Sequence, residues 1–107
     1  MQLKDKWALI TGSTRGIGQQ VAVGLAIHGC NIIVHGRELE HAEQTLKRLR
    51  TFPVQTFVVA GELGNIEAEN AFIEQILEHI GYIDILYNNA AIMAQWHDQI
   101  YDIPMDE

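Results

Sequence analysis

Short apolar segments alternate with amphipathic segments along most of the chain. Four apolar runs are predicted to be strands, and they cover residues 7–10, 31–35, 54–59 and 83–87. The first is interpreted as a buried strand, and the second is rich in β-branched residues. Between them, apolar residues recur at helical spacing in three segments, which cover residues 16–28, 38–50 and 65–79. Strand and helix patterns that alternate in this way predict an α/β domain with a parallel sheet and right-handed crossovers.

The three helical segments mark their ends and their buried faces in different ways. Gly29 follows the first segment and is typical of the residue just past a helix C-terminus. Gly24, inside that segment, is interpreted as a close-packing position. Asn65 is the predicted N-cap of the third segment. The apolar face of the second segment is predicted to consist of Leu39, Ala42, Leu46 and Leu49.

Composition and charge exclude several classes of partner. Hydrophobic residues make up 48% of the 107 residues and charged residues 20%, which is typical of a globular domain. No apolar run approaches the ~18 residues that a membrane span needs, and the N-terminus lacks a secretory signal, so we expect a cytoplasmic protein. The net charge of −7 argues against nucleic acid and anionic membranes as partners. Cys30 is the only cysteine, so an internal disulfide is excluded.

Positive charge is confined to the first half of the chain. All seven Lys and Arg residues lie at or before Arg50. A ligand that carries phosphate groups would therefore have to meet its cations there.

A glycine-rich segment, T-G-S-T-R-G-I-G, connects the first predicted strand to the first predicted helix. Gly12 can adopt a positive φ and turn the chain out of the strand. Gly16 lets a pyrophosphate approach the backbone, and Gly18 lets the helix pack closely on the strand. The helix N-terminus then offers unpaired N–H groups and a partial positive charge to phosphates. The loop residues predicted to bind a dinucleotide are Gly12, Ser13, Arg15, Gly16, Ile17 and Gly18.

Two motifs together resemble the short-chain dehydrogenase/reductase family. T-G-x-x-x-G-I-G follows the first strand, and Asn88-Asn89-Ala90-Ala91 follows the fourth strand, where the family has N-N-A-G. The resemblance covers the whole chain, 1–107, as one NAD(P)-binding domain that matches the front part of a typical member. It implies a Rossmann-type doubly wound sheet with strand order 3-2-1-4 and helices on both faces. It also implies that Asn89 and Ala90 line the cofactor ribose.

The end of the second strand favours NADP(H) over NAD(H) as the cofactor. NAD-preferring Rossmann domains place an acidic residue about 20 positions after the glycines, where it binds the ribose hydroxyls. Gly36 stands at that position here, and Arg37 follows it with a guanidinium that can bind a 2′-phosphate. By the same resemblance, Arg15 is a second cation on this side of the cofactor. Glu62 is the nearest match to an Asp that contacts the adenine amine in the family.

The resemblance also implies catalytic residues that this chain lacks. The family transfers a hydride between the nicotinamide and a carbonyl or alcohol substrate, with a Tyr-x-x-x-Lys pair and a serine. The only serine is Ser13, and the residues four positions after the three tyrosines are Leu86, Ala91 and Met105. We therefore predict no catalytic residue within the chain and no activity of the chain alone.

Three interpretations of this absence stay open. The chain is a truncated part of an NADP(H)-dependent oxidoreductase, a non-catalytic nucleotide-binding module, or one half of a split enzyme. The first is favoured because residues 102–107 read as the start of a further helix, with a proline and acids in its first turn. The substrate is not indicated.

The five histidines give no indication of a metal site. They are His28, His35, His41, His79 and His97, and their spacing to one another, to cysteine and to acids is not that of metal ligands. We interpret them as core or surface residues and predict no bound metal.

Overall fold

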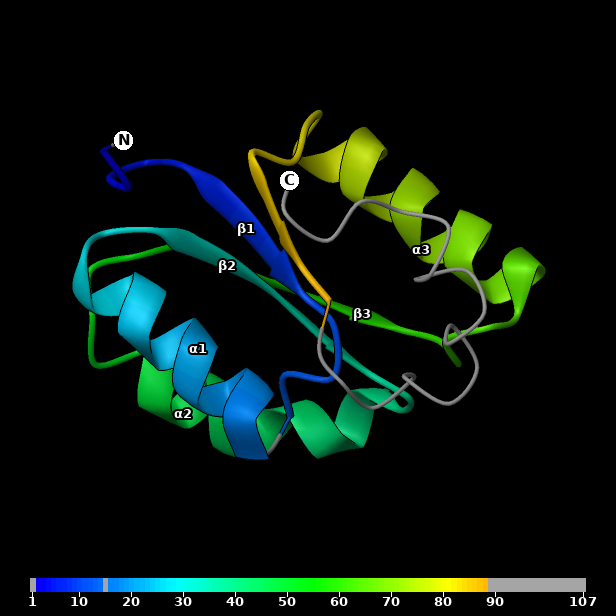
Figure 1. The fold of residues 1–107 in the computed structure, drawn as a ribbon, viewed down its shortest axis with the longest axis horizontal. Helices are drawn as coiled ribbons and strands as arrows, with labels where there is room; N and C mark the ends of the chain where they lie inside the picture. Colours follow the sequence, from blue (N-terminus) through cyan, green and yellow to red (C-terminus); the bar gives the residue numbers. More distant parts are fainter. Residues whose placement is uncertain (1, 15, 89–107) are drawn as a thin grey trace, which may run out of the picture.

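A four-stranded parallel sheet forms the centre of the molecule (Figure 1). The structure is a computed structural model that describes residues 2–14 and 16–88. Its strands are β1 (Trp7–Ile10), β2 (Asn31–Gly36), β3 (Thr56–Ala60) and β4 (Ile85–Tyr87). They lie in the order β3-β2-β1-β4, which confirms the predicted order and the Rossmann-type arrangement.

Helices cover both faces of this sheet, as predicted (Figure 1). On one face lie α1 (Gly16–Ile27) and α2 (Glu43–Leu49), and α2 is preceded by the 3-10 turn η1 (Leu39–Ala42). On the other face lies α3 (Ile66–His79). None of these described helices has both the length and the apolar character needed to cross a membrane.

The second helical segment differs from its prediction. Instead of one helix over 38–50, the chain forms η1 and then α2. A 3-10 turn has three residues per turn rather than 3.6, so it rotates its side chains away from the stripe of the following helix. Leu39 is consequently 63% exposed, whereas Ala42 and Leu49 are buried as expected.

Two apolar clusters hold the layers together, one on each face of the sheet. Alternate residues of a strand point to opposite faces, and β1 contributes to both clusters because all four of its residues are buried. The cluster under α1 and α2 consists of Ala8, Ile10, Ala22, Ala26, Cys30, Ile32, Val34, Ala42 and Leu49. The cluster under α3 consists of Trp7, Leu9, Ile33, Val59, Phe72 and Ile76. A near-continuous apolar strand is what a sheet covered on both faces requires.

The ends of the helices confirm two predictions and correct a third. The Asn65 side chain accepts a hydrogen bond from the Ala68 amide at 3.1 Å and so caps α3. Gly29, just past α1, has φ 87°, which glycine adopts without strain. Gly24 is not a close-packing position, because a Cβ placed there would meet no heavy atom within 4 Å.

Some predictions concern positions outside the described residues. They are the cofactor contacts of Arg15, Asn89 and Ala90, and the helix start at 102–107.

Candidate nucleotide-binding site

The predicted cofactor residues within the described part of the chain gather at one edge of the sheet. In a parallel sheet the carboxyl ends of all strands meet at the same edge, and ligands bind there at the point where the strand order reverses. The glycine loop follows β1, Arg37 follows β2 and Glu62 follows β3. Because β1 lies between β2 and β4, the loop starts at the reversal point of this sheet.

The start of α1 is an exposed stretch of backbone. Gly12 and Gly16 have φ values of 63° and 61°, a region that residues with a side chain rarely adopt. A Cβ built at Gly16 would meet nothing within 4 Å. Ile17 is 64% exposed and Gly18 is buried against the sheet. The first N–H groups of a helix have no partner within the helix, so this end of α1 can receive an anion.

Ser13 fixes the loop to β2. Its side chain is fully buried. Its Oγ accepts a hydrogen bond from the His35 amide at 2.9 Å and donates to the His35 carbonyl at 3.4 Å. The Ser13 amide donates to that carbonyl as well, at 2.9 Å. Ser13 was predicted to bind the dinucleotide, but its hydroxyl is engaged with the backbone of β2.

His35 links the glycine loop to the end of β3, which the sequence did not indicate. Its Nδ1 accepts from the Gly12 amide at 2.9 Å, and its Nε2 lies 2.8 Å from the Gly61 carbonyl oxygen. An amide nitrogen can only donate and a carbonyl can only accept, so the ring is neutral with its proton on Nε2. Burial lowers the pKa of His35, and the Gly61 hydrogen bond and the charge of Glu69 act in the opposite direction. The sequence offered one signal for this role of His35, which is a polar residue near the end of a strand of buried apolar residues.

A second set of hydrogen bonds supports the loop from α1 and α2. Thr45 is fully buried, and its Oγ1 donates to the Ser13 carbonyl at 2.9 Å. The Gln19 side-chain amide donates to Thr45 Oγ1 at 2.9 Å and to the Thr14 carbonyl at 3.3 Å. Arg48 Nη1 donates to Gln19 Oε1 at 2.6 Å. Sequence reasoning missed this set, although the spacing of Thr45 from buried residues three before and four after it places it on the buried face of the helix.

Glycine at position 36 is required by the packing of the loop. A Cβ at Gly36 would lie 2.5 Å from Thr14 Cγ2. The Thr14 methyl group thus occupies the space that a side chain at position 36 would need. Any substitution at Gly36 must displace Thr14.

The structure brings Arg37 and Glu62 together beyond the ends of β2 and β3. Arg37 Nη1 lies 3.8 Å from Glu62 Oε1, and the two side chains are 71% and 68% exposed. Two residues predicted to contact different parts of the cofactor are therefore ion-pair partners. Such exposed pairs contribute only ~0.2–1 kcal/mol, so a ligand phosphate can compete for the guanidinium.

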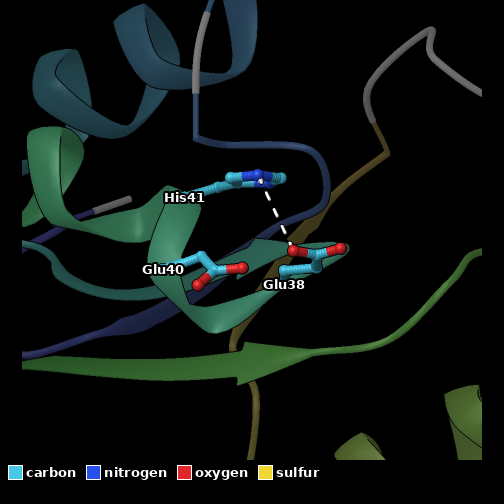
Figure 2. Close-up of side chains that lie close together, drawn as sticks. All are labelled: Glu38, Glu40 and His41. Carbon is cyan, nitrogen blue, oxygen red and sulfur yellow. Dashed lines mark ion pairs between the residues drawn. The ribbon is translucent and has the colours of Figure 1, made fainter.

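Three exposed side chains of η1 and the residue before it also lie close together (Figure 2). Ligand atoms of Glu38, Glu40 and His41 all lie within 4.8 Å of one another, and His41 Nε2 is 3.9 Å from Glu38 Oε2. The hydrogen bond and the negative charge of Glu38 raise the pKa of Glu40. Sequence reasoning missed this grouping. Because all three side chains are exposed, we assign them to the solvated surface.

The sequence profile described as short chain dehydrogenase matches residues 6–107. The chain belongs to the short-chain dehydrogenase family. Family membership confirms the resemblance that the glycine loop and the Asn88 motif indicate.

Relatives and solved structures share the front part of the fold. General stress protein 39 of Bacillus subtilis is 43% identical over 90 residues, which are 83% of this chain and 32% of that protein. A versicolorin reductase of Emericella nidulans is 32% identical over 107 residues, 99% of this chain and 40% of that protein. L-sorbose reductase from Gluconobacter frateurii, solved with NADPH and L-sorbose, superposes with a TM-score of 0.78 at 33% identity and covers 85% of this chain and 36% of its own. A metagenomic short-chain oxidoreductase in complex with NADP gives 0.74 at 26% identity, over 80% and 38% of the two chains.

This short-chain dehydrogenase chain therefore spans between a third and two fifths of the length of such relatives. Family membership and the NADPH-bound and NADP-bound neighbours support a nicotinamide dinucleotide as its cofactor.

Proposed function

We propose that this chain binds NADP(H) and is the cofactor-binding part of an oxidoreductase that moves a hydride between NADP(H) and a carbonyl or alcohol substrate. The observation behind the proposal is the open backbone at the start of α1. A Cβ built at Gly16 would meet no heavy atom within 4 Å, so a ligand can approach the backbone there. The diphosphate lies against these N–H groups, and the positive end of the helix dipole favours its charge.

Preference for NADP(H) comes from Gly36, the last residue of β2, and from Arg37, which follows it. Thr14 packs against Gly36, so Arg37 leaves the strand beside the glycine loop. Its guanidinium binds the 2′-phosphate in place of Glu62, its partner at 3.8 Å. A hydrogen bond to a charged group contributes about 1.5–3 kcal/mol, or about 10- to 150-fold in affinity. Position 36 is a glycine, so no carboxylate at that position repels the phosphate.

Glu62 completes the adenosine side of the proposed site. When the 2′-phosphate takes Arg37, the Glu62 carboxylate is released to accept from the adenine amine. Arg15, Asn89 and Ala90 keep the roles that the family resemblance implies for them.

Catalysis requires groups other than those of this chain. The 107 residues contain no Tyr-x-x-x-Lys, and their one serine, Ser13, is bonded to the backbone of β2. We propose that the hydride transfer takes place only where a further polypeptide segment supplies that pair. Oxidation of NADPH by the purified 107-residue chain with a carbonyl substrate would contradict this.

Calorimetric titration with NADPH and NADH tests the cofactor assignment. The expected result is tighter binding of NADPH, and a fall in NADPH affinity of about 10-fold or more in Arg37→Ala, with NADH affinity unchanged. Arg50→Ala is the matched control. Arg50 lies just past the end of α2 and forms an exposed ion pair with Glu43, so the substitution removes the same charge from the same kind of pair. Equal affinities for the two nucleotides, unaltered by Arg37→Ala, would overturn the assignment.

A further inference from the structure

Three chain segments that bound the proposed site meet at one buried ring. His35, the next-to-last residue of β2, is 1% exposed. Its Nδ1 accepts from the amide of Gly12, at the start of the glycine loop, and its Nε2 donates to the carbonyl of Gly61, just past β3.

The Gly61 end of this link is firmly held. The Gly61 amide donates to the Gly36 carbonyl at 3.1 Å, which extends the pairing of β2 with β3. A Cβ at Gly61 would lie 3.0 Å from Phe72 Cδ2, so α3 packs directly on this backbone. The Phe72 ring also lies 5.0 Å from the His35 ring, between centroids, at 45°. The imidazole is thus held in place at Nε2 by the end of β3, and its Nδ1 can hold the Gly12 amide in place.

We infer that His35 is a positioning residue for the cofactor, which holds the glycine loop in its binding conformation by accepting the Gly12 N–H at Nδ1. The inference rests on the proposed function. Gly12 has φ 63°, the turn that sends the chain from β1 toward α1. Fixing its peptide plane sets the direction of the loop, and so the position of the N–H groups that meet the diphosphate.

The neutral ring is essential to this arrangement. A protonated imidazole donates from both nitrogens, so the Gly12 N–H would face another N–H across 2.9 Å. Among residues 2–14 and 16–88, the charged side chain that acts on the ring is Glu69, from α3, and it favours protonation. The hydrogen-bond partners of the ring are backbone groups, namely the Gly12 amide of the glycine loop and the Gly61 carbonyl just past β3. Burial outweighs Glu69 and lowers the pKa of His35, so protonation of the folded protein requires a pH below the ordinary histidine value of about 6.5.

Two substitutions separate the two ends of the ring. In His35→Asn, Oδ1 takes the place of Nδ1 and can accept the Gly12 N–H, but nothing reaches Gly61. In His35→Gln, Nε2 takes the place of the ring Nε2 and can donate to the Gly61 carbonyl, but the acceptor for Gly12 is lost. Both are neutral at every relevant pH. His28→Asn, at an exposed position just past the end of α1, controls for the removal of a histidine elsewhere.

NADPH affinity of these proteins is measured by calorimetry between about pH 5 and pH 8, the range in which histidine titrates. We expect His35→Gln to raise the dissociation constant about five- to tenfold at pH 8, equivalent to about 1–1.4 kcal/mol, and His35→Asn to stay near the wild type. We expect the wild-type affinity to fall in acid more steeply than that of His35→Asn. The cofactor phosphate itself titrates near pH 6, and the Asn variant corrects for it.

Nitrogen chemical shifts of the imidazole supply a readout that does not depend on the cofactor. The expected result in the wild type is the Nε2-protonated neutral form at pH 7. Wild-type protein that binds no NADPH overturns the proposed function and this inference with it. Two results would overturn only the inference about His35, provided that the wild-type protein binds NADPH. One is equal NADPH affinity of the Asn and Gln variants, and the other is a ring protonated on Nδ1. If both variants unfold, the pH profile and the ring tautomer of the wild type decide.

Discussion

The inner and outer parts of the same sheet edge are built in opposite ways. The inner part, beneath the glycine loop, contains the fully buried polar side chains of Ser13, His35 and Thr45. Among the described residues, no buried side-chain nitrogen or oxygen lacks a hydrogen-bond partner. The outer part consists of Arg37 and Glu62, which are largely exposed and meet at 3.8 Å. The first part is fixed, and the second can exchange partners.

This difference matches what each part would recognise in the proposed complex with NADP(H). Every nicotinamide dinucleotide has a diphosphate, and a rigid backbone binds it without reorganisation. Only NADP(H) has the 2′-phosphate, and an exposed guanidinium can leave a weak ion pair to bind it. Changes to the inner part should therefore alter affinity for both nucleotides, and changes to the outer part should alter the choice between them.

The largest expected effect comes from Gly16→Ala, at the start of α1. The methyl group would stand between the backbone and the diphosphate, and loss of one contact to a charged group corresponds to about 10- to 150-fold in affinity. The positive φ of 61° adds a cost of about 1–2 kcal/mol in stability. Calorimetry should show this weakening for NADPH and NADH alike.

Gly24→Ala is the matched control, because it also adds a methyl group to α1 in open space. Its helical backbone suits alanine, so the free energy of unfolding should rise by about 0.5–1 kcal/mol. Nucleotide affinity should not change. Equal loss of NADPH affinity in the two alanine variants would mean that the start of α1 has no special role.

A change of cofactor preference is expected from Gly36→Asp combined with Thr14→Ala. The aspartate alone collides with Thr14 Cγ2 at 2.5 Å, and removing that methyl group leaves ordinary contacts of 3.5–3.6 Å. The carboxylate can then bind the ribose hydroxyls and repel a 2′-phosphate. The ratio of NADPH to NADH affinity should fall by about 10- to 100-fold, the size of one or more hydrogen bonds to a charged group.

Thr14→Ala alone should keep the preference for NADPH, and Gly36→Asp alone should lower the melting temperature. A double variant that still prefers NADPH would show that position 36 does not face the 2′-position of the ribose.

The smallest effect is expected from Glu62→Gln. It removes the carboxylate that pairs with Arg37 but keeps an amide near the adenine. NADPH affinity should rise by about 1.4- to fivefold at low salt, in keeping with the ~0.2–1 kcal/mol of an exposed pair. The gain should shrink at high ionic strength, since salt screens exposed charges. A gain of the same size for NADH would show that Glu62 acts on a part of the nucleotide other than the 2′-phosphate.

Apolar periodicity in the sequence was sufficient to predict the order of elements and the sheet. It located β1 at its observed bounds, and it located the cap of α3 at Asn65. It placed Leu39 wrongly because periodicity does not distinguish a 3-10 turn from the first turn of a helix. It started β3 two residues early, at Val54 rather than Thr56, since strand boundaries depend on pairing with β2.

The glycines of the loop could be predicted because a sharp turn, a close approach to the backbone and close helix packing each favour a residue without a side chain. The supporting polar side chains could not, because hydrogen bonds between His35, Gly12 and Gly61 join residues that are 23 and 26 positions apart. Only the folded sheet brings these residues together. The Arg37–Glu62 pair was missed for the same reason, although both residues were predicted separately as ligands.

The most direct test of the central claim is a titration of the ¹⁵N-labelled protein with NADP⁺, followed by amide NMR. We expect the largest shifts at Gly16, Ile17 and Gly18, where the diphosphate would meet the start of α1, and smaller shifts at Arg37. Saturating NADP⁺ that leaves these amides unmoved, or that moves mainly residues at the opposite edge of the sheet, would contradict that claim.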